Sequence, residues 1–158
     1  MTPRRAFNVG EDRLTRILQE PKHVLEGVVM QHAGGGTEST FRENLVYSST
    51  SGDAMAGVSM QLRSVRAPAF VYHSFMLVYT HQRQQNIILQ IEVEPAEKVS
   101  HREAGLVIHG PHCVTLNRTE AVREPGWNWF NWLSDFERRA GVSIFGDRIP
   151  PFNGELPL

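Results

Sequence analysis

The residues best suited to chemistry are three histidines that lie within twelve positions, in the stretch HREAGLVIHGPH. His101 opens the stretch, and His109 and His112 flank a Gly110–Pro111 turn. Imidazole titrates near neutral pH, so His109 and His112 could act as acid and base on a phosphodiester. Three imidazoles can also hold a zinc ion and leave its fourth position open. The cluster therefore indicates a candidate catalytic site or, if any metal binds, a candidate metal site.

Other features of the same stretch favour a structural or partner-contacting role over chemistry. The spacing H-x7-H-x2-H is no metal signature by itself, and Glu103 is its one carboxylate. Phosphodiester cleavage would also need cations to stabilise the developing charge, for which Arg102 and Arg118 are the candidates. Cys113 follows His112 directly. In a strand these two side chains point to opposite faces, so they are not expected to act together as a Cys–His pair. We therefore expect no cofactor and no metal, and an enzyme is the less favoured interpretation.

Glycine and tryptophan supply two further patterns. The run Gly34–Gly36 is followed by neither a lysine nor a helix, as a phosphate-binding loop would require, so it is expected to be a hairpin tip. The tryptophans of GWNWFNWL could stack on bases or sugars, but Trp129 and Trp132 have helical spacing and are expected in the core. Trp127 lies near the helix start and remains a candidate binding residue.

The remaining histidines have ordinary interpretations. His73 lies among apolar residues in VYHSFM and is expected to be a neutral, hydrogen-bonded core residue. His23, His32 and His81 lie at the edges of predicted elements and are expected to be solvated.

These residues must be positioned by a series of strands between two helices. Apolar alternation and β-branched runs predict strands over 23–32, 41–49, 57–65, 70–80 and 87–94, with two short strands, GLVIH and CVTLN, around the Gly110–Pro111 turn. The strand 70–80 is apolar on both faces, so it should be central, and the polar segment 81–86 should join it to 87–94 as an antiparallel hairpin. In 87–94, the residues expected to face the core are Ile87, Leu89, Ile91 and Val93.

Helical spacing marks the two ends of the chain. Leu14, Ile17 and Leu18 form one face of a short helix that Pro21 ends. A second helix is predicted over 125–141, with Gly141 as its cap and an apolar stripe formed by Trp129, Leu133, Phe136 and Ala140. The fold class is therefore α+β: a mostly antiparallel sheet of about five to seven strands, with a short N-terminal helix and a Trp-rich C-terminal helix packed on it.

The chain is predicted to be a single domain over 1–158. Residues 1–9 form a tail, and 142–158 is an extended, proline-containing segment that should pack in an ordered way. Phe152, Leu156 and Leu158 of that segment could lie across the core or against a second subunit.

Composition limits the function classes. The formal net charge is −1 over 158 residues, which does not indicate a nucleic-acid protein, although a local basic patch remains compatible with it. One cysteine permits no internal disulfide, which suits a reducing, cytoplasmic setting. No apolar run reaches the length of a membrane span, and the N-terminus lacks the apolar stretch of a signal peptide.

The stretch 101–112 also resembles the core motif of a family of uncharacterised bacterial and phage proteins, H-x-N-x-x-G-x-x-I-x-G-x-H-x-H. The resemblance covers about residues 70–140, and the matching positions are His101, Gly105, Ile108, Gly110 and His112. The chain departs from the motif at Glu103, where the family has Asn, and at Val114, where it has His. The resemblance implies a bacterial or phage origin, sometimes near toxin–antitoxin or defence functions, and no established activity.

Taken together, these patterns favour a small module that binds another macromolecule, either another protein or its own second subunit. Trp127, Arg102, Arg118 and Phe152 are its candidate binding residues. A histidine-dependent phosphodiesterase or nuclease is the first alternative, and a regulatory domain with a small ligand between the sheet and the Trp-rich helix is the second.

Overall fold

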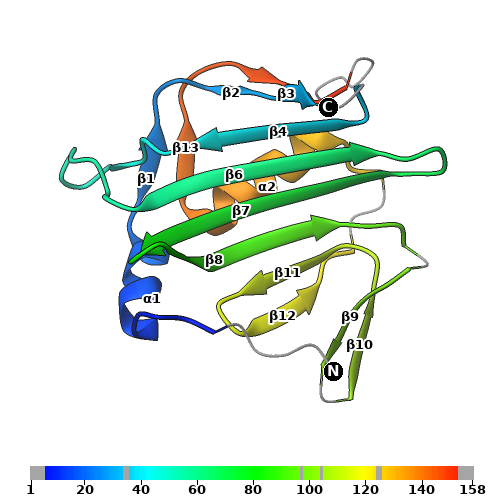
Figure 1. Cartoon of the computed structure of the whole chain (residues 1–158), viewed down its shortest axis with the longest axis horizontal. Coiled ribbons are helices and arrows are strands. Elements are labelled where there is room, and N and C mark those ends of the chain that lie inside the picture. The colour runs from blue at the N-terminus through cyan, green and yellow to red at the C-terminus, as the bar shows by residue number, and fades with distance from the viewer. Residues whose placement is uncertain (1–5, 34–35, 97, 104, 124–125, 153–158) are drawn as a thin grey trace.

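The computed structural model describes residues 6–33, 36–96, 98–103, 105–123 and 126–152, and its main element is a seven-stranded sheet (Figure 1). Every neighbouring pair of these strands is antiparallel. In sheet order the strands are β12 (Arg118–Ala121), β11 (His112–Thr115), β8 (Gln84–Val93), β7 (Val71–His81), β6 (Val58–Arg66), β4 (Glu38–Glu43) and β3 (Gln31–Ala33). The predicted α+β class, the antiparallel sheet and the hairpin of two long central strands are confirmed.

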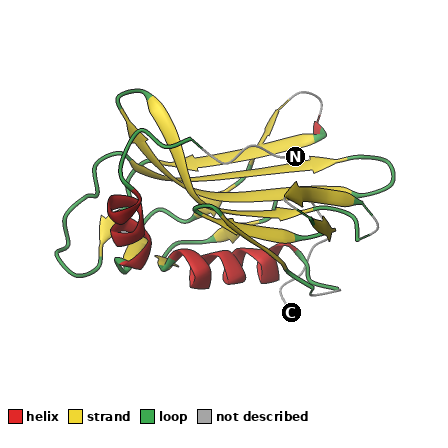
Figure 2. Ribbon diagram, turned by 90° about the horizontal axis from the view of Figure 1, so that it is seen from below, coloured by secondary structure: helices red, strands yellow, loops and turns green. Residues whose placement is uncertain are grey.

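Two helices flank this sheet, as predicted. Helix α1 (Glu11–Gln19) buries Leu14, and helix α2 (Trp129–Ala140) lies along one face of the sheet (Figure 2). Asn128 caps the start of α2, because its side chain accepts from the Asn131 backbone N–H while the Asn131 side chain accepts from the Asn128 N–H. Gly141 ends α2 in the left-handed conformation at φ 67°.

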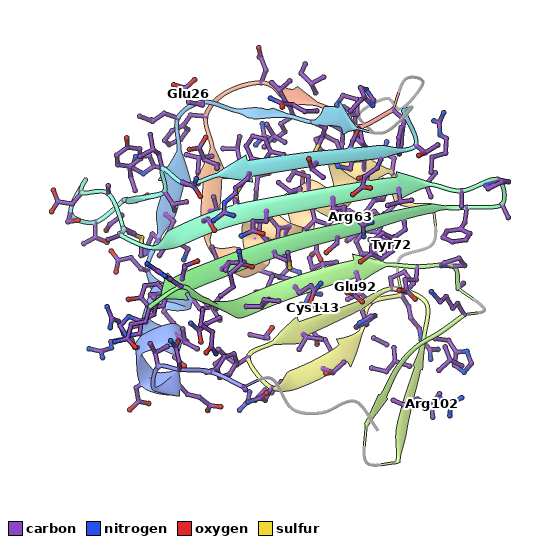
Figure 3. The ribbon with its side chains drawn as sticks, viewed as in Figure 1. Glu26, Arg63, Tyr72, Glu92, Arg102 and Cys113 are labelled. Atoms are coloured by element: carbon purple, nitrogen blue, oxygen red, sulfur yellow. The ribbon has the colours of Figure 1, made fainter. Side chains whose placement is uncertain are left out.

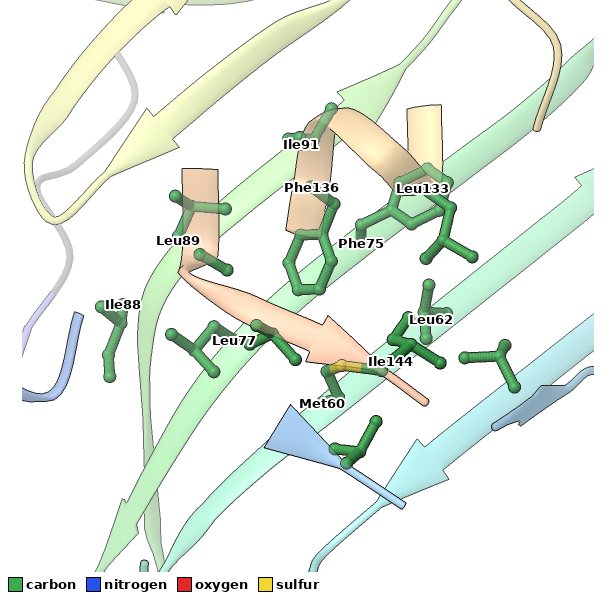
Figure 4. Close-up of a cluster of buried hydrophobic side chains, with 14 of the residues drawn as sticks. Met60, Leu62, Phe75, Leu77, Ile88, Leu89, Ile91, Leu133, Phe136 and Ile144 are labelled. Carbon is green, nitrogen blue, oxygen red and sulfur yellow. The ribbon is translucent and has the colours of Figure 1, made fainter. Parts of the chain in front are cut away.

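The core lies between α2 and the inner face of the sheet (Figure 4). Alternate residues of β6, β7 and β8 point inward, and the rings of Phe75 and Phe136 lie 6.0 Å apart between centroids. The predicted helical stripe is confirmed, since Trp129, Leu133, Phe136 and Ala140 are all wholly buried. The space between sheet and helix is therefore occupied by side chains of the chain itself.

Three smaller sheets complete the fold. β1 (Lys22–Val24) is the middle strand of a three-stranded sheet, parallel to β13 (Val142–Ile144) and antiparallel to β5 (Tyr47–Ser48). β14 (Arg148–Ile149) pairs parallel with β2 (Val28–Val29), and β9 (Val99–Glu103) forms a hairpin with β10 (Leu106–His109). The described part of the segment after α2, residues 142–152, is thus tied into two sheets through β13 and β14.

Several predicted boundaries were wrong. The strand expected over 23–32 is broken into β1, β2 and β3: Gly27, at a φ of 70°, lies in the break between β1 and β2, and Met30 separates β2 from β3. The strand expected over 41–49 is likewise split into β4 and β5. The polar connection expected over 81–86 is only the two-residue turn Gln82–Arg83, and most of it belongs to β7 and β8.

A bulge corrects the expected pattern of β8. The pairing shifts between Leu77 and Val78, so that Leu77 faces Leu89 while Val78 faces Ile87. Ile88 is left as the extra residue and is wholly buried, whereas Ile87, expected in the core, is only half-buried.

Candidate functional site

The three histidines of the predicted cluster lie on three different strands. The backbone of His101 is in β9 opposite Ile108, but its side chain is outside the described residues. His109 is exposed on β10, in the separate hairpin, and His112 is buried on β11, in the seven-stranded sheet. The two short strands around the Gly110–Pro111 turn do not form a hairpin with each other, since β10 pairs with β9 and β11 pairs with β8 and β12.

His112 is only 2% exposed and lies on the outer face of the sheet, opposite α2. Its Nε2 lies 3.3 Å from Oε2 of Glu92, and its Nδ1 lies 3.4 Å from the carbonyl oxygen of Gly110. Both ring nitrogens therefore face acceptors. A general base needs one imidazole nitrogen with its lone pair turned toward the substrate, so this geometry suits an anchor for the turn better than a base.

Glu92 belongs to a wider polar group on the outer face, with Tyr72 on the neighbouring strand β7 and Arg63 one strand further, on β6 (Figure 3). Gln90 Nε2 donates to Oε1 of Glu92 at 2.8 Å and to Oγ of Ser74 at 3.2 Å. Burial, together with the nearby Glu92 carboxylate, raises the pKa of the Tyr72 phenol. The alternation of 87–94 placed Gln90 and Glu92 on this face, but no sequence signal paired Glu92 with His112.

Within the described part of the chain, no group of three His, Cys, Asp or Glu side chains is arranged to hold a metal ion. That finding does not test the set His101, His109 and His112, because the side chain of His101 lies outside the described residues. Cys113 points to the core and is wholly buried, on the side of β11 opposite His112, as its position in a strand predicts.

The four predicted binding residues lie on four different elements or segments. Arg102 on β9 and Arg118 on β12 are exposed. Trp127 is half-buried, with its ring edge-on to Trp132 at 4.8 Å between centroids. Phe152 is 5% exposed and lies beneath the Arg66 guanidinium; Leu156 and Leu158 lie outside the described residues.

A surface that sequence reasoning missed lies on the outward side of the sheet β13-β1-β5. Alternate residues point inward and are buried: Val24 on β1, Val46 beside β5, and Val142 and Ile144 on β13. The residues between them point outward. We call the outward set the apolar face; it consists of His23, Leu25, Leu45, Tyr47 and Phe145.

The registers of this small sheet place the apolar face in two rows. His23 pairs with Tyr47, and the His23 ring lies 5.5 Å from the Tyr47 ring and 5.3 Å from the Phe145 ring. Beyond the paired residues, continuing the β1–β13 register by one position and the β1–β5 register by two sets Leu25 between Phe145 and Leu45. His23 is therefore part of an aromatic cluster with Tyr47 and Phe145. The expectation that it is simply solvated is wrong.

The inner side of β1 is anchored by a buried lysine. Lys22 is 1% exposed, and its ammonium donates to the carbonyl oxygens of Ile17, Leu18 and Glu20 at 2.6, 3.0 and 2.6 Å. These are the carbonyls left without partners at the end of α1, so Lys22 caps the helix from the following strand. Burial lowers the pKa of this ammonium to about 8. The cap fixes β1, and with it the apolar face, relative to α1.

A groove borders the apolar face along the free edge of β13. Ser143 lines it from β13, Phe145 from just beyond that strand, and Arg138 and Arg148 from α2 and β14. Arg148 is held by Glu137 at 2.7 Å, while Arg138 donates to Asp135 and keeps 68% of its side chain exposed. The groove therefore presents a guanidinium beside the exposed Phe145 ring.

The chain matches no known protein family, no curated protein and no solved structure. No helix among the described residues is both long and apolar enough to cross a bilayer.

Proposed function

We propose that this chain is a protein-binding module and that the apolar face of the sheet β13-β1-β5 is its docking surface. One observation carries the proposal. Phe145 and Leu25 directly follow β13 and β1, Leu45 lies two positions before β5, and the three are 67%, 56% and 54% exposed. Single exposed apolar residues are common, but a contiguous group rimmed by polar residues is typical of interaction sites.

The composition of the face supports the same function. Aromatic rings supply much of the binding energy at protein interfaces, because they bury a large area with little loss of side-chain entropy. Here the His23 ring holds Tyr47 and Phe145 on either side of it, which restricts their rotation before a partner binds. A preorganised face loses less conformational entropy on binding.

Selection from a displayed library of random peptides tests this proposal. Wild-type protein would be the target, and Phe145→Ser the counter-target. Peptides enriched on the wild type should bind Phe145→Ser at least about tenfold more weakly, as for a central aromatic anchor. Phe70→Ser is the matched control, because Phe70 is also exposed, at 40%, but lies in the turn between β6 and β7. Enriched peptides that lose affinity equally for both variants would refute the apolar face as the docking surface.

A phosphodiesterase that uses His109 and His112 receives less support from the contacts of the two residues. They belong to different sheets, and both ring nitrogens of His112 face acceptors. Cleavage of RNA and of a generic phosphodiester by wild type and His112→Ala would decide this alternative. Equal, background-level turnover in both proteins would end it.

A small ligand between the sheet and α2 is also less favoured. The side chains that line that space, Trp129, Leu133 and Phe136, are wholly buried against the sheet. Tryptophan fluorescence against a panel of metabolites would detect such a ligand.

A further inference from the structure

We propose that the partner on the apolar face is a second copy of this chain, related to the first by a twofold axis that runs parallel to β1, between the two apolar faces. The inference rests on the proposed function, because it names the occupant of the same surface. It differs from that function in its requirements: the apolar face must be complementary to itself, and not only to some other protein.

Shape is the first reason for self-complementarity. β1 is the middle strand of the small sheet, with β13 on one side and β5 on the other. A twofold axis parallel to β1, placed between two apolar faces, brings the β13 side of one copy against the β5 side of the other. Phe145 then packs on Leu45 of the second copy, and Leu25 packs on its own equivalent. Every large apolar side chain of the row is matched by another.

Charge is the second reason. Beyond β13, Arg138 extends an exposed guanidinium at the groove that Phe145 lines. Beyond β5, the chain returns through a bridge between Tyr47 and Ala54, and the exposed Asp53 precedes that bridge. The same axis that pairs Phe145 with Leu45 carries Arg138 toward Asp53 of the second copy, and does so twice. The basic and acidic flanks thus lie on opposite sides of the face, as an isologous interface requires.

Three charges near the face, on Arg148, Asp135 and Glu43, are compatible with this arrangement. Arg148 is already neutralised by Glu137. Asp135 accepts from one amino group of Arg138, and a guanidinium has further donors for a second carboxylate. Glu43 accepts from the backbone N–H of Leu45, next to the apolar row, and adds negative charge on the β5 side.

The size of the apolar face sets the expected affinity of the dimer. Five side chains and two flanking ion pairs cover less than the roughly 800 Å² per partner of a standard interface. We therefore expect a reversible dimer with a dissociation constant in the micromolar range, about 1 to 100 µM.

Sedimentation equilibrium of the full chain tests the inference, over about 1 to 300 µM so that a micromolar constant is bracketed. Wild type should shift from monomer to dimer, and Phe145→Ser should remain monomeric over most of the range, a loss of at least about tenfold in affinity. Phe70→Ser should dimerise as the wild type does. Tryptophan fluorescence of each variant checks that it folds.

A charge exchange tests the axis itself. Arg138→Glu places two acidic pairs across the dimer, and Asp53→Arg places two basic pairs, so each variant alone should dimerise more weakly than wild type. An equimolar mixture restores both attractive pairs and should form a mixed dimer more strongly than either variant alone. Two misfolded variants would not regain dimerisation on mixing, so this recovery excludes misfolding as the cause of the weaker binding.

The outcomes separate this inference from the proposed function. A chain that stays monomeric throughout overturns the second copy as partner, while peptide selection still decides whether the face binds protein. A dimer that survives Phe145→Ser overturns the inference because the contact lies elsewhere. A dimer lost in Phe145→Ser, but with no recovery in the mixture of charge variants, overturns the proposed twofold arrangement.

Discussion

Acid should destabilise this protein through one buried histidine, His73. The ring is 5% exposed on the inner face of β7, and its Nδ1 lies 2.7 Å from Oγ of Ser64 on β6. Burial lowers the pKa of His73 from 6.5 to about 4, because the charged imidazolium is poorly solvated there. The residue is thus the neutral, hydrogen-bonded core histidine that its apolar neighbours in the sequence predict.

The sign of the pH effect follows from where the proton binds. Between pH 6.5 and 4 the unfolded chain binds a proton at His73 that the folded chain does not, so stability falls as the pH falls through this window. Each pKa unit corresponds to about 1.4 kcal/mol, so the shift sets an upper value of about 3 kcal/mol, fully lost only below pH 4. About 2 kcal/mol of this should already be lost by pH 5.

Urea denaturation followed by tryptophan fluorescence, at pH 7.5 and pH 5, measures this loss. His73→Gln keeps a polar group for Ser64 but cannot titrate, so it should escape the loss due to His73. Between pH 7.5 and pH 5 its free energy of unfolding should therefore fall by about 2 kcal/mol less than that of wild type. His81→Gln is the matched control, since His81 ends the same strand and is only half-buried; this variant should lose as much as wild type. If His73→Gln loses as much stability at pH 5 as wild type does, the reasoning is wrong.

Two further predictions concern stability. Gly27→Ala should cost at least about 3 kcal/mol in urea denaturation, because a Cβ at Gly27 would lie 2.5 Å from the Asp147 carbonyl oxygen; Gly52→Ala, at a similar positive φ but in open space, should cost about 1 kcal/mol. Equal losses of stability in the two variants would show that the close approach of Gly27 to Asp147 does not matter. Glu92→Gln should cost about 1 to 2 kcal/mol, because the buried His112 ring loses its carboxylate partner, and a variant as stable as wild type would contradict the anchoring role.

The parts of the fold that could be predicted from sequence are those where one element contains its own signal. Alternation in 57–65 indicated β6, and the helical stripe around Trp129 indicated α2 with Gly141 as its cap. The turn between β7 and β8 was predicted too long, because Gln82 and Arg83 both adopt positive φ without the Asn-Gly or Asp-Gly that usually marks such a turn. β9 and β12 were missed because each is short and polar and becomes a strand by pairing with a neighbour.

The candidate site shows the same division. The three histidines were conspicuous because they are close in sequence, yet β9–β10 and β11 belong to separate sheets. The partner of His112 is Glu92, twenty positions away, and strand register alone brings the two together.

By itself, the sequence determined the α+β class, the central hairpin, the two helices and the burial of His73, because periodicity and local apolar context act over a few residues. Only the tertiary structure decided which surface is exposed for binding. Segments near 23, 47 and 143 have little in common as sequence, but parallel and antiparallel pairing join them in one small sheet. That pairing buries every second side chain, and just beyond the paired residues Leu25, Leu45 and Phe145 stay more than half exposed, with no element of the described residues covering them.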